Sequence, residues 1–177
     1  MDNNESFQLQ YSNEDDRAFG LAGMAISMAS LDALDLITEI FLDSEGPMIR
    51  FANNYYYSMS PSISPKAVWN NLLNNLHLTT TLVIGNVMAR TLVRLGHEAD
   101  EKIISQVRDL VREEGRDVCS LEEEEADALF DKVMRHSLRL FHNPRLHPAV
   151  KELAGVISRK RRLSVLDLAE ELEMLRI

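Results

Sequence analysis

The chain has 177 residues, of which 45% are apolar and 6% aromatic, and its formal net charge is −9. This length and apolar content suffice for one domain with a substantial core, and the few aromatic, glycine and proline residues favour helices over sheets. The single cysteine, Cys119, excludes an intrachain disulfide and a zinc site built from several thiolates of one chain. We expect it to be an ordinary buried or half-buried thiol.

The amino-terminal segment is polar and acidic and lacks the basic start and apolar run of a signal peptide, so a cytoplasmic location is the default expectation. We expect residues 1–11 to form a loosely ordered tail and residues 12–177 a single all-α domain. Two uncharged runs, 18–31 and 67–89, resemble membrane spans. The first is too short, and the second carries many amides that would be costly in lipid, so we predict no membrane contact.

The first helix is predicted from about residue 14 to about residue 44, where SEGP (44–47) breaks it. A capping box formed by Ser12 and Asp15 is expected at its start. A short helix around 49–56 and a loop at 58–65 follow.

Ser64 and Pro65 then predict the start of a long helix that ends near residue 95, before Gly96. Its apolar stripe, expected to face the core, is formed by Trp69, Leu72, Leu76, Val83 and Val87.

Charged helices are predicted in the remainder of the chain. One covers about 98–114 and ends at Gly115, and the next begins at Ser120 with a capping box. Two more begin near Pro148 and Ser164. No alternating strand pattern of useful length is present. The sequence therefore predicts one all-α bundle of six or seven helices, with the uncharged helices 14–44 and 65–95 at its centre.

Small residues cover one face of the first helix, and Gly85 is a small residue on the second central helix. Such residues let two helix axes approach closely, either within the fold or at a subunit interface. Those on the first helix are Ala18, Ala22, Ala25, Ala29 and Ala33.

Charge is distributed unevenly along the chain. Residues 1–46 hold ten acidic residues and one basic residue (net −9), whereas 143–163 hold six basic residues and one acidic residue (net +5). This asymmetry can steer partners, or it can pair the two segments within the fold or between subunits.

Three of the five histidines, His136, His142 and His147, lie in VMRHSLRLFHNPRLHP (133–148). The first two are six residues apart, which separates them by about 120° on a helix. Neither Glu-x-x-His nor His-Glu-x-x-His occurs in the chain. We interpret these residues as helix ends and predict no metal or cofactor.

A polar stripe of Asn70, Asn74, His77 and Thr81 runs along the uncharged helix 65–95. Buried polar groups need partners. The stripe therefore predicts an internal hydrogen-bond network, a hydrated subunit interface, or a pocket for a small polar ligand.

The basic run of Arg159, Lys160, Arg161 and Arg162 could contact phosphates. The following LSVLDLAEEL resembles the first helix of a helix-turn-helix, but only EMLRI follows it, where that motif needs a turn and a recognition helix. The alternative is a solvated linker between two helices. Its cations would then be stabilised by the negative carboxyl-terminal end of the preceding helix.

Phosphate-binding, dinucleotide-binding and nucleophile-elbow motifs are absent from the sequence. We expect a non-catalytic cytoplasmic helical protein that acts through protein–protein contact, with an unidentified protein partner and as a homodimer. One alternative is a nucleic-acid-associated regulator using residues 159–162. The other is a small-ligand-binding bundle with a pocket near Asn70, Asn74 and His77.

Overall fold

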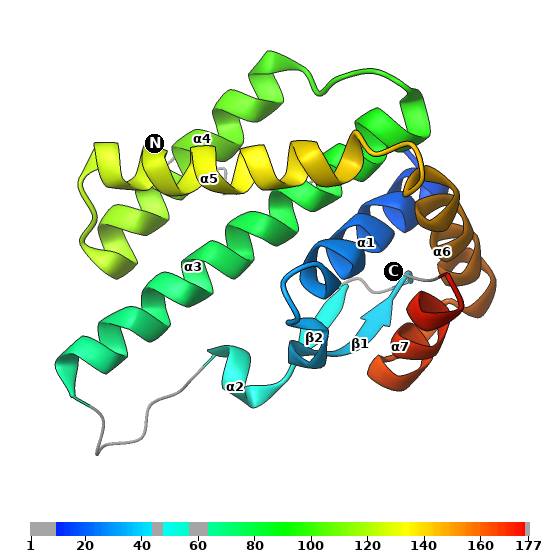
Figure 1. Cartoon of the computed structure of the whole chain (residues 1–177), viewed down its shortest axis with the longest axis horizontal. Coiled ribbons are helices and arrows are strands. Elements are labelled where there is room, and N and C mark those ends of the chain that lie inside the picture. Colours follow the sequence, from blue (N-terminus) through cyan, green and yellow to red (C-terminus); the bar gives the residue numbers. More distant parts are fainter. Residues whose placement is uncertain (1–9, 44–47, 57–63, 176–177) are drawn as a thin grey trace, which may run out of the picture.

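The computed structural model describes residues 10–43, 48–56 and 64–175. Helices dominate these residues, which confirms the predicted all-α class, and a small sheet accompanies them (Figure 1). Residues 1–9 of the predicted tail, the predicted break at 44–47 and most of the predicted loop at 58–65 lie outside the described residues. The helices are α1 Glu14–Ala29, α2 Asn53–Tyr56, α3 Pro65–Met88, α4 Glu101–Cys119, α5 Glu123–Phe141, α6 His147–Lys160 and α7 Val165–Met174.

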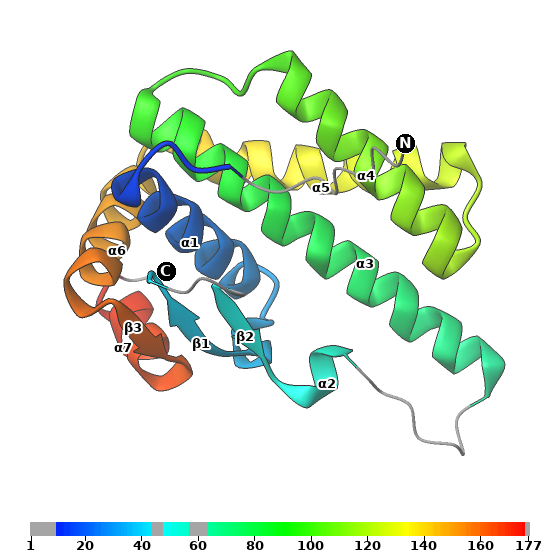
Figure 2. The same ribbon diagram turned by 180° about the vertical axis from the view of Figure 1, so that it is seen from behind.

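The two helices whose charged residues are confined to the first turn, α1 and α3, form the centre of the fold, as predicted. α6 covers the other side of α1, and the α4–α5 hairpin packs along α3 (Figures 1 and 2). Every buried residue of α3 lies at or after Leu76. The amino-terminal half of α3 therefore extends beyond α1 and contributes little to the core.

The contact between α1 and α3 depends on glycine in both helices. A Cβ atom at Gly23 would collide with the carbonyl oxygen of Gly85, and a Cβ atom at Gly85 would collide with the Ser27 side chain. Ala18, Ala22 and other small residues of α1 are fully buried. This small-residue face is thus occupied within the fold and is not free to form a subunit interface.

The helix α1 ends at Ala29, much earlier than the predicted residue 44. Asp32 has a left-handed backbone (φ 53°), which a continuous helix excludes. A 3₁₀ turn, Leu34–Leu36, and the strand β1, Ile37–Phe41, follow. Isoleucine and threonine in this strand favour extended backbone.

β1 is the central strand of an antiparallel three-stranded sheet with the order β2-β1-β3. Its neighbours are β2, Ile49–Phe51, and β3, Arg162–Ser164. The sequence shows no alternating strand pattern of useful length, yet these three short strands form. The single helix predicted at 49–56 was wrong, because this segment is β2 followed by α2. Strands of three to five residues are too short to show a clear alternation.

The helical path of α3 continues through a π-helical segment, Ala89–Leu95, and ends at Gly96, whose φ is 75°. Both the predicted end and its glycine are confirmed. Within the described residues, Pro65–Leu95 is one helix long and apolar enough to cross a membrane, and 72% of its most apolar 18-residue window is buried inside the fold. A buried core helix of a soluble protein has the same properties.

Several predicted helix ends shift by a few residues. The N-cap of α1 is Asn13 rather than Ser12, since Asn13 Oδ1 accepts the backbone N–H of Asp16 at 2.8 Å. α4 runs through Gly115 to Cys119, and α5 is capped by Glu122 rather than Ser120. The starts of α3 and α7, at the Ser64 and Ser164 caps, are confirmed.

Gly85→Ala tests the helix crossing. The added methyl group has no room, so the free energy of unfolding should fall by about 2 kcal/mol despite the better helix propensity of alanine. Gly155→Ala in α6 is the matched control, because its Cβ would meet only the flexible tip of Arg159 at 3.3 Å. That variant should be neutral or more stable by up to about 1 kcal/mol in urea unfolding. Equal stability of the two variants would contradict the close contact between α1 and α3 at Gly85.

Candidate functional site

The predicted polar stripe of α3 is not gathered into one buried cluster. Asn70 and Asn74 are exposed, and His77 is half-buried. Thr81 is buried and donates its hydroxyl to the His77 carbonyl oxygen at 2.8 Å. Burial lowers the pKa of His77, and the nearby Lys132 and His136 lower it further. The stripe thus runs from open surface into the core.

All four predicted phosphate-binding cations form surface ion pairs with carboxylates of the same chain. Two of the four pair with acidic residues of the segment 1–46, so the acidic and basic segments meet within one chain. The pairs are Arg159 with Glu152, Lys160 with Glu171, Arg161 with Glu14 and Asp43, and Arg162 with Glu39. A phosphate would have to compete with these carboxylates.

The histidines of 133–148 lie apart and contact different neighbours. His136 Nε2 is 3.0 Å from Ser30 Oγ, and His147 Nε2 is 2.7 Å from the carbonyl oxygen of Phe141. Within the described residues, no three His, Cys, Asp or Glu side chains are grouped so that they could hold a metal ion.

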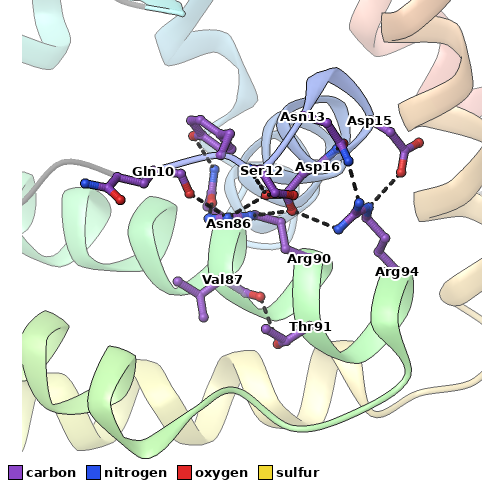
Figure 3. A network of polar contacts seen from close by, with 11 residues as sticks. Gln10, Ser12, Asn13, Asp15, Asp16, Asn86, Val87, Arg90, Thr91 and Arg94 are labelled. Carbon is purple, nitrogen blue, oxygen red and sulfur yellow. Dashed lines mark hydrogen bonds and ion pairs between the residues drawn. The ribbon is translucent and has the colours of Figure 1, made fainter.

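A partly buried ionic network joins the start of α1 to the end of α3 and to the π-helical segment that continues it (Figure 3). Arg90 donates two hydrogen bonds to the Asp16 carboxylate, of 2.8 and 2.7 Å, and Arg94 donates a third of 3.2 Å. Arg90 also donates to the Gln10 carbonyl oxygen at 2.7 Å, and Asn86 donates to the Tyr11 hydroxyl at 2.9 Å.

Gln10 and Tyr11, expected in the loose tail, are therefore held by Arg90 of the π-helical segment and by Asn86 of α3. Burial of Asp16 alone would raise the pKa of its carboxyl group. Hydrogen bonds from Arg90 and Ser12, together with the charges of Arg90 and Arg94, outweigh this effect and lower that pKa from 3.8 to about 2. Since its side chain is only 4% exposed and both its oxygens have partners, Asp16 is a structural anchor rather than a reactive acid.

An apolar surface lies where the amino-terminal half of α3 meets the carboxyl-terminal end of α4. Trp69 is 43% exposed, Leu72 37% and Val118 49%. Leu72 lies one turn after Trp69 on α3, and Val118 immediately precedes the Cys119 carbonyl that Trp69 contacts. We call these three residues the α3–α4 patch.

The indole ring of Trp69 is fixed by its own hydrogen bond. Its Nε1–H donates to the Cys119 carbonyl oxygen at 2.9 Å, while much of its apolar surface stays exposed. Cys119 itself has a buried thiol, as expected. Burial raises the pKa of this thiol, and the negative charge of Glu114 raises it further. A protonated, buried thiol is a poor nucleophile, so Cys119 contributes packing rather than chemistry here.

The sequence assigned Trp69 and Leu72 to the core-facing stripe of α3, and both are exposed instead. Helical periodicity identified a common face, but α1 covers that helix only from Leu76 onward. The ionic network was also missed. Its one signal in the sequence was the presence of Arg90 and Arg94, one turn apart, on an otherwise almost uncharged helix.

The Asp16 network predicts a pH-dependent stability. Because the folded-state pKa of Asp16 lies below its ordinary value, the unfolded state binds more protons between about pH 4 and pH 2. The network's contribution of about 2 kcal/mol should be complete at neutral pH and lost as the pH falls through this range. Asp16→Asn should abolish this loss in urea unfolding, whereas Asp15→Asn, with a side chain 64% exposed, should retain it. An unchanged profile in Asp16→Asn would contradict the assignment.

The comparisons with known proteins do not add a family to this picture. No family model matches the chain, and neither a curated protein nor a solved structure matches it.

Proposed function

We propose that this protein acts by binding another protein through the α3–α4 patch, without catalysing a reaction. One observation carries the proposal: the chain's only tryptophan is hydrogen-bonded into a fixed orientation and still exposes 43% of its surface. Tryptophan is enriched among residues that dominate binding energy, and exposed apolar patches mark interaction sites. A preordered ring loses little conformational entropy on binding.

The alternative functions have less support from the geometry. The cations at 159–162 already have carboxylate partners, which lowers the positive potential available to a nucleic acid. Asn70 and Asn74 lie on open surface, where water competes with a small ligand. A homodimer and a cytoplasmic location stay predictions from the sequence. The small-residue face and the charge asymmetry that suggested the dimer are both accommodated within the fold.

Affinity capture from the cells that make the protein, with quantitative mass spectrometry, tests the proposed contact. A partner retained by the wild-type chain should be reduced about tenfold by Leu72→Ala and by Trp69→Ala, because truncating an interface anchor costs about 1.4 kcal/mol or more. Leu166→Ala is the matched control, since Leu166 is 72% exposed on α7, far along the chain from the patch.

The control should retain the partner at the wild-type level. Leu72→Ala removes a side chain that is outside the core, so it should fold even if Trp69→Ala is destabilised. Equal recovery of the same proteins by all four chains would contradict the proposal.

A further inference from the structure

We infer that the occupant of the α3–α4 patch is a basic amphipathic helix of a partner protein. This inference rests on the proposed function and adds the chemical class of the partner. The patch itself is apolar, and its member on α4, Val118, lies in a strongly acidic part of the chain, directly after Asp117 and one helical turn after Glu114. Between residues 113 and 125 the chain has seven acidic residues and one basic residue, a net charge of −6.

The acidic border is solvent-exposed. Its members on α4 are Glu113, Glu114 and Asp117, and at the start of α5 it continues with residues 122–125. A ligand that covers Val118 therefore lies beside the carboxylates of Asp117, its chain neighbour, and of Glu114, one turn earlier on α4. Cationic side chains flanking its apolar surface would complement them.

The cations nearest this border pair with some of its members and leave others without a partner. Arg112 holds Asp127 and Glu123, and Arg116 pairs with the adjacent Asp117. In the described part of the chain, Glu113 and Glu114 form no ion pair. Partial burial, and then the neighbouring negative charge of Glu113, raise the pKa of Glu114. An incoming lysine or arginine would relieve this repulsion.

The shape of the patch suits a helix. Trp69 and Leu72 are separated by one helical turn on α3, and Val118 lies on the neighbouring helix α4, directly before the Cys119 carbonyl group that accepts the Trp69 hydrogen bond. A partner helix presents apolar residues at intervals of three and four, with charged residues beside them. Such a helix places its apolar stripe on the patch and its cations against the border.

The described residues of a second copy of this chain do not present a basic apolar helix of this kind. Outside the patch, the large apolar side chains that the described residues expose are Leu95, Leu166 and Met174. Leu166 and Met174 lie on α7 beside the exposed Glu170 and Glu173, so this surface carries the same sign of charge as the border. Contact between two patches would likewise bring two acidic borders together.

The fluorescence of Trp69, the only tryptophan, provides a direct titration of the patch. The probe is a synthetic peptide of about 18 residues, built from leucine and lysine with all leucines on one helical face. We expect it to shift the Trp69 emission to shorter wavelength as the ring loses contact with water. Binding should weaken as salt is added. A peptide with glutamate in place of lysine, and one with the same composition in scrambled order, should both bind at least about tenfold more weakly.

Matched charge variants locate the site. Glu113→Gln combined with Glu114→Gln should weaken the leucine–lysine peptide about tenfold. Glu170→Gln combined with Glu173→Gln removes the same charge from α7 and should leave the affinity unchanged. Leu72→Ala should weaken binding while Leu166→Ala does not.

Three results would overturn the inference: equal binding of the scrambled or glutamate peptide, equal losses in the α4 and α7 charge variants, or a dimer in sedimentation equilibrium that Leu72→Ala dissociates. If the peptide fails while partner capture still depends on Leu72, the proposed protein contact stands and the basic helix is wrong.

Discussion

The packing of α1 against α3 is the contact on which the other elements depend. It is possible because Gly23 and Gly85 leave no side chain between the two backbones at their crossing. The Asp16–Arg90 pair then fixes how far one helix lies along the other, because a bidentate carboxylate–guanidinium contact tolerates little sliding. With α1 fixed against the second half of α3, α6 and the sheet can pack on it. The first half of α3 is left without cover from α1.

The sequence predicts well what is determined locally. The Ser64 and Ser164 caps and the terminal Gly96 act within one helical turn, and all three were recognised. The two uncharged helices were likewise identified as central, because charge is excluded from a core. The end of α1 was missed because apolar residues continue past Ala29 and only the backbone at Asp32 shows the break.

Features that depend on contacts between distant parts of the chain were not predictable in the same way. Asp16 stands in an acidic first turn, where the helix dipole already explains a carboxylate, so its pairing with Arg90 was not apparent. Trp69 and Leu76 share a stripe, yet one is exposed and the other buried. That difference depends on where α1 ends relative to α3. The apolar surface of the candidate site arises from this relative placement rather than from any motif.

The sheet has a consequence for the order in which the chain can fold. β1 pairs with β2 across a short connection, but its other neighbour, β3, is more than a hundred residues away, and the ion pair between Glu39 and Arg162 spans 123 positions. During synthesis from the amino terminus, one edge of β1 stays without a hydrogen-bonding strand until residues 162–164 have been made. Closing such a long loop has a high entropic cost unless the intervening helices have already docked. The three-stranded sheet is thus completed late. It joins early and late parts of the chain when the helices between them are in place.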